Sequence, residues 1–136
     1  KELIKAKADV NKAKNSGVTP TFMAAQNGHV EALKELIKAK ADVNKAPDHG
    51  FTPTFVAAQN GHVEALNELM KAKPDVNKAR NDGATPTFIA ARNGQVEALK
   101  HLIKAKADVN KAPDHGATPT LMAAQNGHQE ALKELI

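Results

Sequence analysis

Histidines are the side chains of this chain with the clearest capacity for proton transfer or metal binding. Three of the six, His29, His62 and His128, each follow an Asn-Gly pair at matching positions of a repeating sequence. If successive copies stack like neighbouring helices, adjacent copies lie ~10 Å apart. That separation is too large for two imidazoles to bind one metal ion. We therefore interpret these three residues as structural histidines of a turn.

Two other histidines lie beside carboxylates, His49 next to Asp48 and His115 next to Asp114. Each pair belongs to a turn segment, and the two pairs are two repeats apart. Neither pair supplies the four ligands of a tetrahedral metal site. We expect these residues to make surface contacts, and we expect the chain to hold no metal ion and no cofactor.

Residues that could form a covalent intermediate are almost missing from the sequence. The chain contains no cysteine and no tyrosine, and Ser16 is its one serine. Nucleophilic catalysis by serine or cysteine needs such a side chain next to a general base. Carboxylates do occur in pairs, such as Glu31 with Glu35, but they alternate with lysines as on a solvated helix face. The inventory predicts that the protein is not an enzyme.

A strict repeat supplies the elements that position all of these residues. The sequence Thr-Pro-Thr-Phe begins at Thr19, Thr52 and Thr85, a Thr-Pro-Thr-Leu variant begins at Thr118, and each step is 33 residues. A fixed period of this length indicates a stacked repeat protein. We expect one domain over residues 1–136. It would comprise a half repeat (1–18), three full repeats (19–51, 52–84 and 85–117) and a second half repeat (118–136).

Each repeat reads as two short helices followed by a turn. In the copy at 19–51, Thr19 and Pro20 suit the start of a helix, and Gly28 suits its end. A second helix is expected from about residue 30 to 39, because Val30 and Leu33 open an apolar stripe at helical spacing. Proline and glycine then mark a projecting turn at 46–50. A single unit cannot bury its stripe, so we predict an all-helical solenoid.

The chain resembles the ankyrin repeat family over essentially its whole length. The matching motifs are Thr-Pro at 52–53, Ala-Ala at 57–58, Asn-Gly-His at 60–62, Glu-Ala-Leu at 64–66 and Asp-Val-Asn at 75–77. The resemblance implies an ankyrin-type α-solenoid with projecting β-turn fingers. It also implies protein binding through the finger tips and the first helices on the concave side.

The sequence departs from the family pattern at two places. Thr-Phe stands where the family favours Leu-His after Thr-Pro, so the corner has lost a hydrogen-bonding histidine. Lysine replaces the glycine that precedes Ala-Asp-Val-Asn, at Lys40, Lys73 and Lys106. If that residue still forms a left-handed helix cap, each lysine costs on the order of 1 kcal/mol. We expect altered finger geometry and an unchanged fold.

Composition argues against nucleic acids and membranes as partners. The net charge is +4, but lysines and glutamates are interleaved, and the chain has four Phe, no Tyr and no Trp. Single-stranded nucleic acids usually need aromatic side chains for stacking. No apolar run approaches the roughly 18 residues of a membrane span. We expect a cytoplasmic protein that binds neither nucleic acid nor membrane.

Differences between the copies concentrate in the turns and along the first helices. Such variation on a constant frame is typical of a binding surface, although drift at exposed positions predicts the same pattern. We expect a non-catalytic scaffold that binds a partner protein of unknown identity. The alternative is a structural spacer, or an engineered repeat scaffold, with no specific partner. The expected contact residues are Asp48, His49, Phe51, Gln59, Asn81, Asp82, Arg92, Asp114, His115 and Gln125.

The two ends of the sequence lie within expected helices. Leu3 and Ile4 at one end, and Leu135 and Ile136 at the other, belong to stripes that a neighbouring repeat would cover. Terminal repeats normally carry polar outer faces. We therefore expect end-to-end self-association or frayed ends.

Overall fold

The computed structural model describes residues 8–136, apart from the side chain of Asp48. Eight α-helices and one 3-10 turn form the described part of the chain, and none of it is a β-strand. The elements are α1 (Pro20–Asn27), α2 (Val30–Lys38), η1 (Asp48–Gly50), α3 (Pro53–Asn60), α4 (Val63–Lys71), α5 (Pro86–Arg92), α6 (Val96–Lys104), α7 (Pro119–Gln125) and α8 (Gln129–Leu135).

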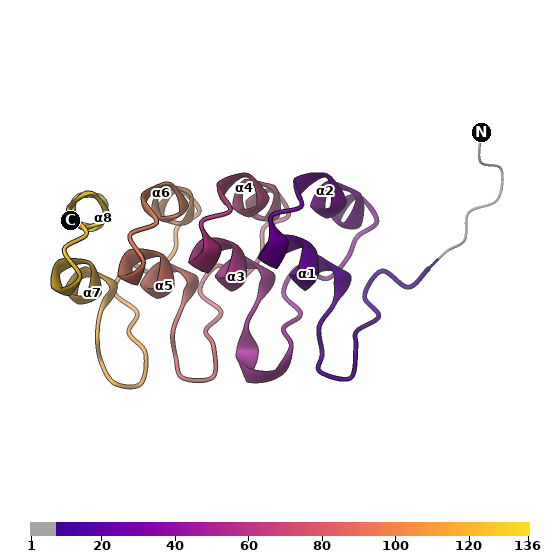
Figure 1. The fold of residues 1–136 in the computed structure, drawn as a ribbon, viewed down its shortest axis with the longest axis horizontal. Coiled ribbons are helices and arrows are strands. Elements are labelled where there is room, and N and C mark those ends of the chain that lie inside the picture. The colour runs from indigo at the N-terminus through magenta and orange to yellow at the C-terminus, as the bar shows by residue number, and fades with distance from the viewer. Residues whose placement is uncertain (1–7) are drawn as a thin grey trace.

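The helices stack in two layers (Figure 1). The first helices of the pairs, α1, α3, α5 and α7, pack side by side in one layer, and the second helices, α2, α4, α6 and α8, form the other. The segments between pairs project beyond the first layer as a row of loops. This arrangement confirms the predicted all-helical solenoid of stacked helix pairs.

The first threonine of each Thr-Pro motif starts a helix as predicted. The Oγ1 of Thr19 accepts a hydrogen bond from the amide of Phe22 at 3.1 Å. Thr52, Thr85 and Thr118 accept equivalent bonds at 3.0–3.1 Å. The proline that follows has no amide hydrogen, which suits the first helical turn. These caps fix the start of every first helix.

The second threonine of the motif behaves differently. Thr21, Thr54 and Thr87 are buried, and their hydroxyls have no hydrogen-bond partner in the described part of the chain. A buried hydroxyl without a partner costs roughly 1–3 kcal/mol. The motif therefore contains one threonine that stabilises the helix and one that carries a desolvation cost.

The core consists of small residues on the first helices and leucines on the second. Ala58 and Ala91 have no exposed surface, which lets α3 and α5 approach closely. Leu66, Leu99 and Leu102 are also fully buried. Each such leucine contributes roughly 1.5–3 kcal/mol through burial. Because each helix layer is continuous, one repeat supplies the packing surface for the next.

The lysines after the second helices adopt the left-handed conformation. Lys40, Lys73 and Lys106 have φ angles of 64°, 54° and 67°. In the first copy the amide of Ala41 donates to Leu36 O at 3.0 Å, the bond that closes a Schellman cap. A non-glycine residue in this conformation costs roughly 1–2 kcal/mol. The left-handed cap, which entered the sequence analysis only as a condition, is thus present in all three copies.

Side chains also connect successive repeats along the edge that follows the second helices. Asn11, Asn44 and Asn77 each use Oδ1 to accept the backbone amide of an aspartate in the next repeat. Those aspartates are Asp42, Asp75 and Asp108, at 2.8–2.9 Å. This asparagine ladder holds the interhelical segments at the spacing of the repeats.

Candidate functional site

Four projecting loops differ between copies at every position except their glycine. We call them the first to fourth fingers, at residues 14–18, 47–51, 80–84 and 113–117. The third finger is closed by a hydrogen bond from the Arg80 amide to Ala84 O at 2.8 Å. The second and fourth fingers begin with Pro47 and Pro113, which lack the donor for that bond. Sequence variation thus changes the hydrogen bonding of the fingers themselves.

Backbone hydrogen bonds join the tips of neighbouring fingers. The amide of Asn81 donates to His49 O at 2.8 Å, and the amide of Asp114 donates to Asp82 O at 2.9 Å. These residues occupy equivalent places in consecutive repeats. The second, third and fourth fingers are therefore connected tip to tip, and they form a continuous surface below the first helices.

The structure brings four of the ten predicted contact residues together in one place. A cavity of about 340 Å³ opens between the second and third fingers. Its lining consists of His49, Phe51, Arg80, Asn81 and Asp82. His49, Asn81 and Asp82 are exposed, whereas Phe51 is half-buried. The cavity thus combines an apolar ring with polar groups that remain accessible.

Arg80 contacts other residues at this cavity, although it is not among the ten predicted contact residues. Its guanidinium carbon lies 5.3 Å from the ring centre of Phe51 and 5.1 Å from that of Phe55. The two rings pack edge to face at 5.4 Å. Arginine over aromatic rings gains both packing and cation–π attraction. The available signal was the replacement of the proline found at positions 47 and 113 by an arginine, two residues before an aspartate.

The same arginine forms a two-pronged ion pair with Asp82. Arg80 Nε donates to Oδ1 at 2.9 Å, and Nη2 donates to Oδ2 at 2.7 Å. The hydrogen bond from Arg80 is the main cause that lowers the pKa of Asp82 from 3.8 to about 2, with further help from the Ala84 amide. Asp82 therefore stays ionised, and the negative charge faces solvent with its side chain 51% exposed.

A different set of side chains lies between the third and fourth fingers. His115 packs edge to face on Phe88, with ring centres 5.9 Å apart. Its Nδ1 also accepts the amide of Ala117 at 3.4 Å. The positions equivalent to Phe51 and Arg80 are Ala84 and Pro113, so the arginine-aromatic cluster is not repeated here. Asp114 and His115 are exposed at the tip.

The other predicted contact residues lie on the first helices. Gln59, Arg92 and Gln125 occupy equivalent positions near the ends of α3, α5 and α7. Asn93 Nδ2 donates to Gln59 O at 3.3 Å, and Asn126 Nδ2 donates to Arg92 O at 3.0 Å. These bonds fix the backbone of the row from one repeat to the next. The finger cavity is lined by other residues, so the row is a separate part of the surface.

Asp48 completes the predicted set. Its backbone lies in η1 at the tip of the second finger. Because its side chain is outside the described part of the structure, its contact with a partner stays a prediction.

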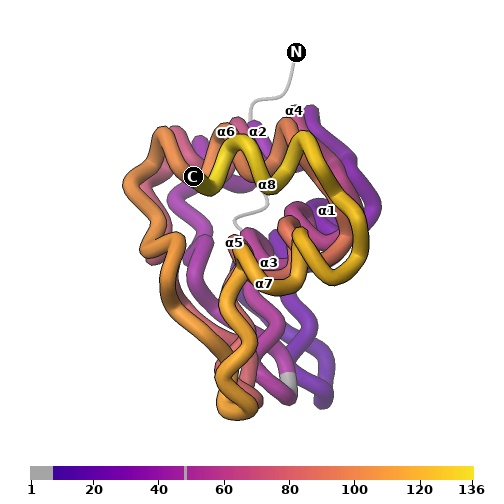
Figure 2. Tube along the Cα trace, turned by 90° about the vertical axis from the view of Figure 1, so that its left-hand side faces the viewer, coloured from indigo at the N-terminus to yellow at the C-terminus, as the bar shows by residue number. Residues whose placement is uncertain are grey.

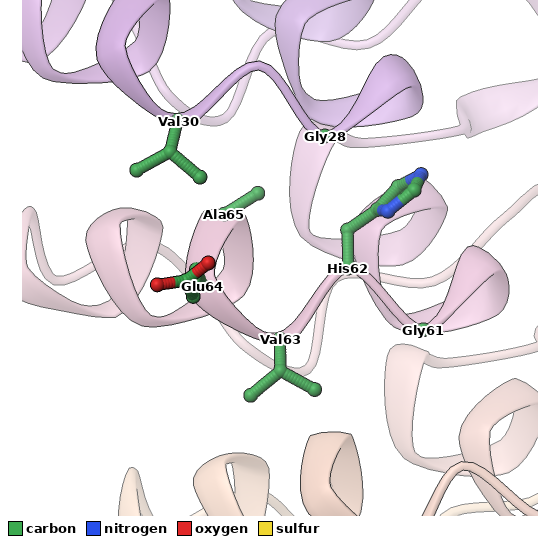
Figure 3. A pocket seen from close by; sticks show the side chains of 7 residues that line it. All are labelled: Gly28, Val30, Gly61, His62, Val63, Glu64 and Ala65. Atoms are coloured by element: carbon green, nitrogen blue, oxygen red, sulfur yellow. The ribbon is translucent and has the colours of Figure 1, made fainter.

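Two of the three turn histidines, His62 and His128, pack against the preceding repeat (Figure 3 shows His62). The ring of His62 lies over Gly28, and a Cβ atom placed on that glycine would be 2.7 Å from His62 Nδ1. Gly94 has the same relation to His128, at 2.6 Å. His62 and Glu64 are among the residues that line an open hollow of about 250 Å³. The tight glycine contacts agree with a structural role for these histidines.

Glutamates on the second helices pair with lysines. Glu31 lies 3.3 Å from Lys34, and Glu68 lies 3.0 Å from Lys71.

Within residues 8–136, no group of three or more metal-ligating side chains is gathered at one place. No helix in this same range is both long and apolar enough to cross a bilayer.

Sequence comparison identifies the family of this stack. The family described as "Ankyrin repeats (3 copies)" matches residues 1–80 and 58–136, which together cover the chain. This chain belongs to the ankyrin repeat family. No curated protein is significantly similar to it. Ankyrin repeats generally serve as protein–protein interaction modules and are typically not enzymes.

The ends of this ankyrin stack bear on the predicted self-association. Leu3 and Ile4 lie outside the described residues. At the other end, Leu121 is 53% exposed and Ile136 is 88% exposed, whereas Phe88, the equivalent of Leu121 in the preceding repeat, is 3% exposed. These exposures do not test association, and end-to-end stacking stays a prediction.

Proposed function

We propose that this ankyrin repeat protein is a non-catalytic scaffold that binds a partner protein through its fingers and first helices. The cavity between the second and third fingers forms the centre of the surface. The fourth finger and the first-helix row extend it. The proposed contact residues are Asp48, His49, Phe51, Gln59, Asn81, Asp82, Arg92, Asp114, His115 and Gln125.

The observation that carries this proposal is the bonding between finger tips. The bonds from Asn81 to His49 and from Asp114 to Asp82 hold three fingers in register. Loops that are already ordered lose little conformational freedom when a partner binds, and this preserves affinity. A row of unconnected loops would have to be ordered on binding.

The side chains at the cavity suit a protein partner. Arginine and aromatic residues often dominate the binding energy of interfaces, and here Phe51 and Arg80 form the cavity wall. His49 and Asn81 offer exposed polar groups at the rim. A partner side chain that enters the cavity would contact Phe51 and would meet the Arg80–Asp82 ion pair.

A pull-down with quantitative proteomics tests the proposal. The variant His49→Ala/Asn81→Ala/His115→Ala changes exposed tip residues and retains the Arg80–Asp82 pair. The matched control is Glu31→Ala/Glu64→Ala/Glu97→Ala, three exposed positions on the second helices. We expect the tip variant to capture at least about tenfold less of each protein that the unchanged chain captures, because interface contacts are truncated.

Equal capture by the tip variant and the unchanged chain would reject the finger surface. In that case a structural spacer would account better for the array. Circular dichroism of both variants checks that the helices are retained.

A further inference from the structure

A second surface, on a different edge of the stack, is strongly basic. Each described repeat carries three lysines at the end of its second helix and in the segment that follows. All nine are exposed: Lys38, Lys40, Lys45, Lys71, Lys73, Lys78, Lys104, Lys106 and Lys111. We call this surface the lysine edge. It lies on segments 38–45, 71–78 and 104–111, none of which belongs to a finger.

The fold arranges these lysines in parallel rows. The segments that carry them run along one side of the stack, opposite the turns within each helix pair (Figure 2). The asparagine ladder ties each segment to the next, for example through Asn44 Oδ1 and the Asp75 amide at 2.9 Å. Equivalent lysines therefore recur once per repeat, ~10 Å apart by the usual spacing of packed helices.

Acidic groups do not cancel the charge of this edge. The three segments hold nine lysines and three aspartates, a surplus of six positive charges that exceeds the +4 of the whole chain. Each aspartate uses Oδ1 to accept a local backbone amide, as Asp42 does from Asn44 at 2.9 Å. Lys71 also pairs with Glu68 of its own helix. Each repeat retains about two net charges on this edge.

Backbone strain indicates that the middle lysine of each segment (Lys40, Lys73 and Lys106) does not stabilise the fold. Each repeat has a left-handed position after each of its two helices, besides the glycine of its finger. After the first helix the residue is glycine, as at Gly28 and Gly61 with φ of 71°. After the second helix it is Lys40, Lys73 or Lys106, although glycine would be less strained. Strain kept in the same place in three copies points to a function of the side chain.

We propose that the lysine edge binds an extended acidic polypeptide segment that carries a carboxylate at about every third residue. In the polyproline II conformation a chain advances ~3.1 Å per residue with three residues per turn, so carboxylates three residues apart lie on the same side, ~9 Å apart, close to the spacing of the repeats. Each carboxylate then meets the lysines of one repeat. This site goes beyond the finger surface and is independent of it.

Nucleic acid fits the same charges less well. A DNA strand carries a phosphate every ~3.4 Å along the duplex axis, several for each repeat. Single strands also bind through stacking aromatics, whereas aromatic residues make up 3% of the chain and none lies in the three segments. A periodic carboxylate ligand agrees better with one basic cluster per repeat.

Binding is measured by fluorescence anisotropy with three labelled probes and the full chain. The first is an uncharged-spacer peptide of about ten residues with Glu at every third position, long enough for three repeats. The second has the same glutamates in one block, and the third is a thymidine oligonucleotide of equal length. We expect the periodic peptide to bind most tightly, and its affinity to fall as salt rises.

The decisive variant is Lys40→Gly/Lys73→Gly/Lys106→Gly. Because glycine relieves the strain at φ of 54–67°, we expect this variant to have a higher Tm than the unchanged chain. We also expect it to bind the periodic peptide about tenfold more weakly. A gain in Tm with a loss of binding separates the charge of the lysines from their structural effect.

Two further variants complete the test. Lys45→Gln/Lys78→Gln/Lys111→Gln removes the same charge from loop positions of the edge and should also weaken binding about tenfold. Lys34→Gln/Lys100→Gln/Lys133→Gln removes equal charge from exposed positions on the second helices, outside the edge, and should leave binding near the starting affinity.

Three results would overturn the proposal. One is unchanged binding by both edge variants. Another is equal loss in the off-edge control, which would indicate attraction by net charge alone. The third is tighter binding of the glutamate block or of the oligonucleotide than of the periodic peptide.

Discussion

The contact between the second and third fingers differs from that between the third and fourth in its side chains, although both share one backbone hydrogen bond at the tip. Both contacts have one amide-to-carbonyl bond at the tip, at 2.8 and 2.9 Å. The first adds Arg80 stacked on Phe51 and Phe55 and bonded to Asp82. The second has His115 on Phe88 instead.

This difference separates what the repeat conserves from what it varies. The backbone bonds set the position of the fingers in both contacts, so side chains can change there without altering the stack. The second-to-third contact uses this freedom to build a cavity with a charged rim. Its equivalent one repeat later carries Ala84 and Pro113 in place of Phe51 and Arg80.

Alanine at the finger glycines should have the largest effect and tests the shared backbone. A Cβ atom on Gly83 would lie 2.9 Å from Pro113 Cα and 3.0 Å from the Asp114 amide, whereas one on Gly116 meets nothing within 4 Å. Both glycines have φ near 85–88°, so alanine would be strained at either position. We expect Gly83→Ala to lower the free energy of unfolding by about 3 kcal/mol and Gly116→Ala by about 1 kcal/mol.

Gly50→Ala should fall between these two, because its Cβ would lie 3.1 Å from the Asn81 amide and 3.2 Å from Arg80 Cα. Urea unfolding measures all three. Equal losses for Gly83→Ala and Gly116→Ala would show that contact between fingers adds nothing to stability.

Arg80→Ala tests the side chains that distinguish the two contacts. It removes the packing on two rings and the bidentate bond to Asp82, so we expect a loss of about 1–2 kcal/mol. His115→Ala in the other contact should cost about 0.5 kcal/mol, the low end for an aromatic pair. Thermal unfolding of the two variants is the measurement. A larger loss for His115→Ala would reverse the comparison.

The pH dependence of stability should differ between the unchanged chain and Asp82→Asn. The pKa of Asp82 is lowered from 3.8 to about 2 in the folded protein. Its contribution is thus present above pH 3.8 and is lost as the pH falls through about 2. Because the side chain is half exposed, solvent screening limits this contribution to less than about 1 kcal/mol.

Urea midpoints between pH 5 and pH 2 measure this effect, because the contribution of Asp82 falls from pH 3.8 toward the lowered pKa of about 2. The unchanged chain should lose more stability than Asp82→Asn over that interval. Identical slopes would contradict the role of the Arg80–Asp82 pair.

The repeat allowed the fold to be predicted from the sequence, since the Thr-Pro caps and the glycine stops depend on local chemistry. Thr19 and Gly28 act as expected because a cap needs neighbours only a few residues away. The left-handed lysines also depend on local chemistry, but their conformation entered the sequence analysis only as a condition. In each case the period supplied the remaining geometry.

The finger cavity could be predicted only in part. His49, Phe51, Asn81 and Asp82 were selected because they vary, and they do line one cavity. Arg80 was missed because its importance comes from Phe55, which lies 25 residues earlier and packs beside it only when the helix pair between them folds back. The tip bonds between fingers also arise from stacking and leave no motif within one repeat.

We propose above that a partner protein binds the finger tips. A photo-cross-linking amino acid placed at position 81, and separately at position 34 on the second helix, tests it most directly in cells that make the chain. Asn81 and Lys34 are both exposed, so reactivity with solvent is matched. We expect one dominant protein adduct from position 81, and we expect that adduct to be absent from position 34. The same adduct from position 34, or no protein adduct from position 81, would contradict it.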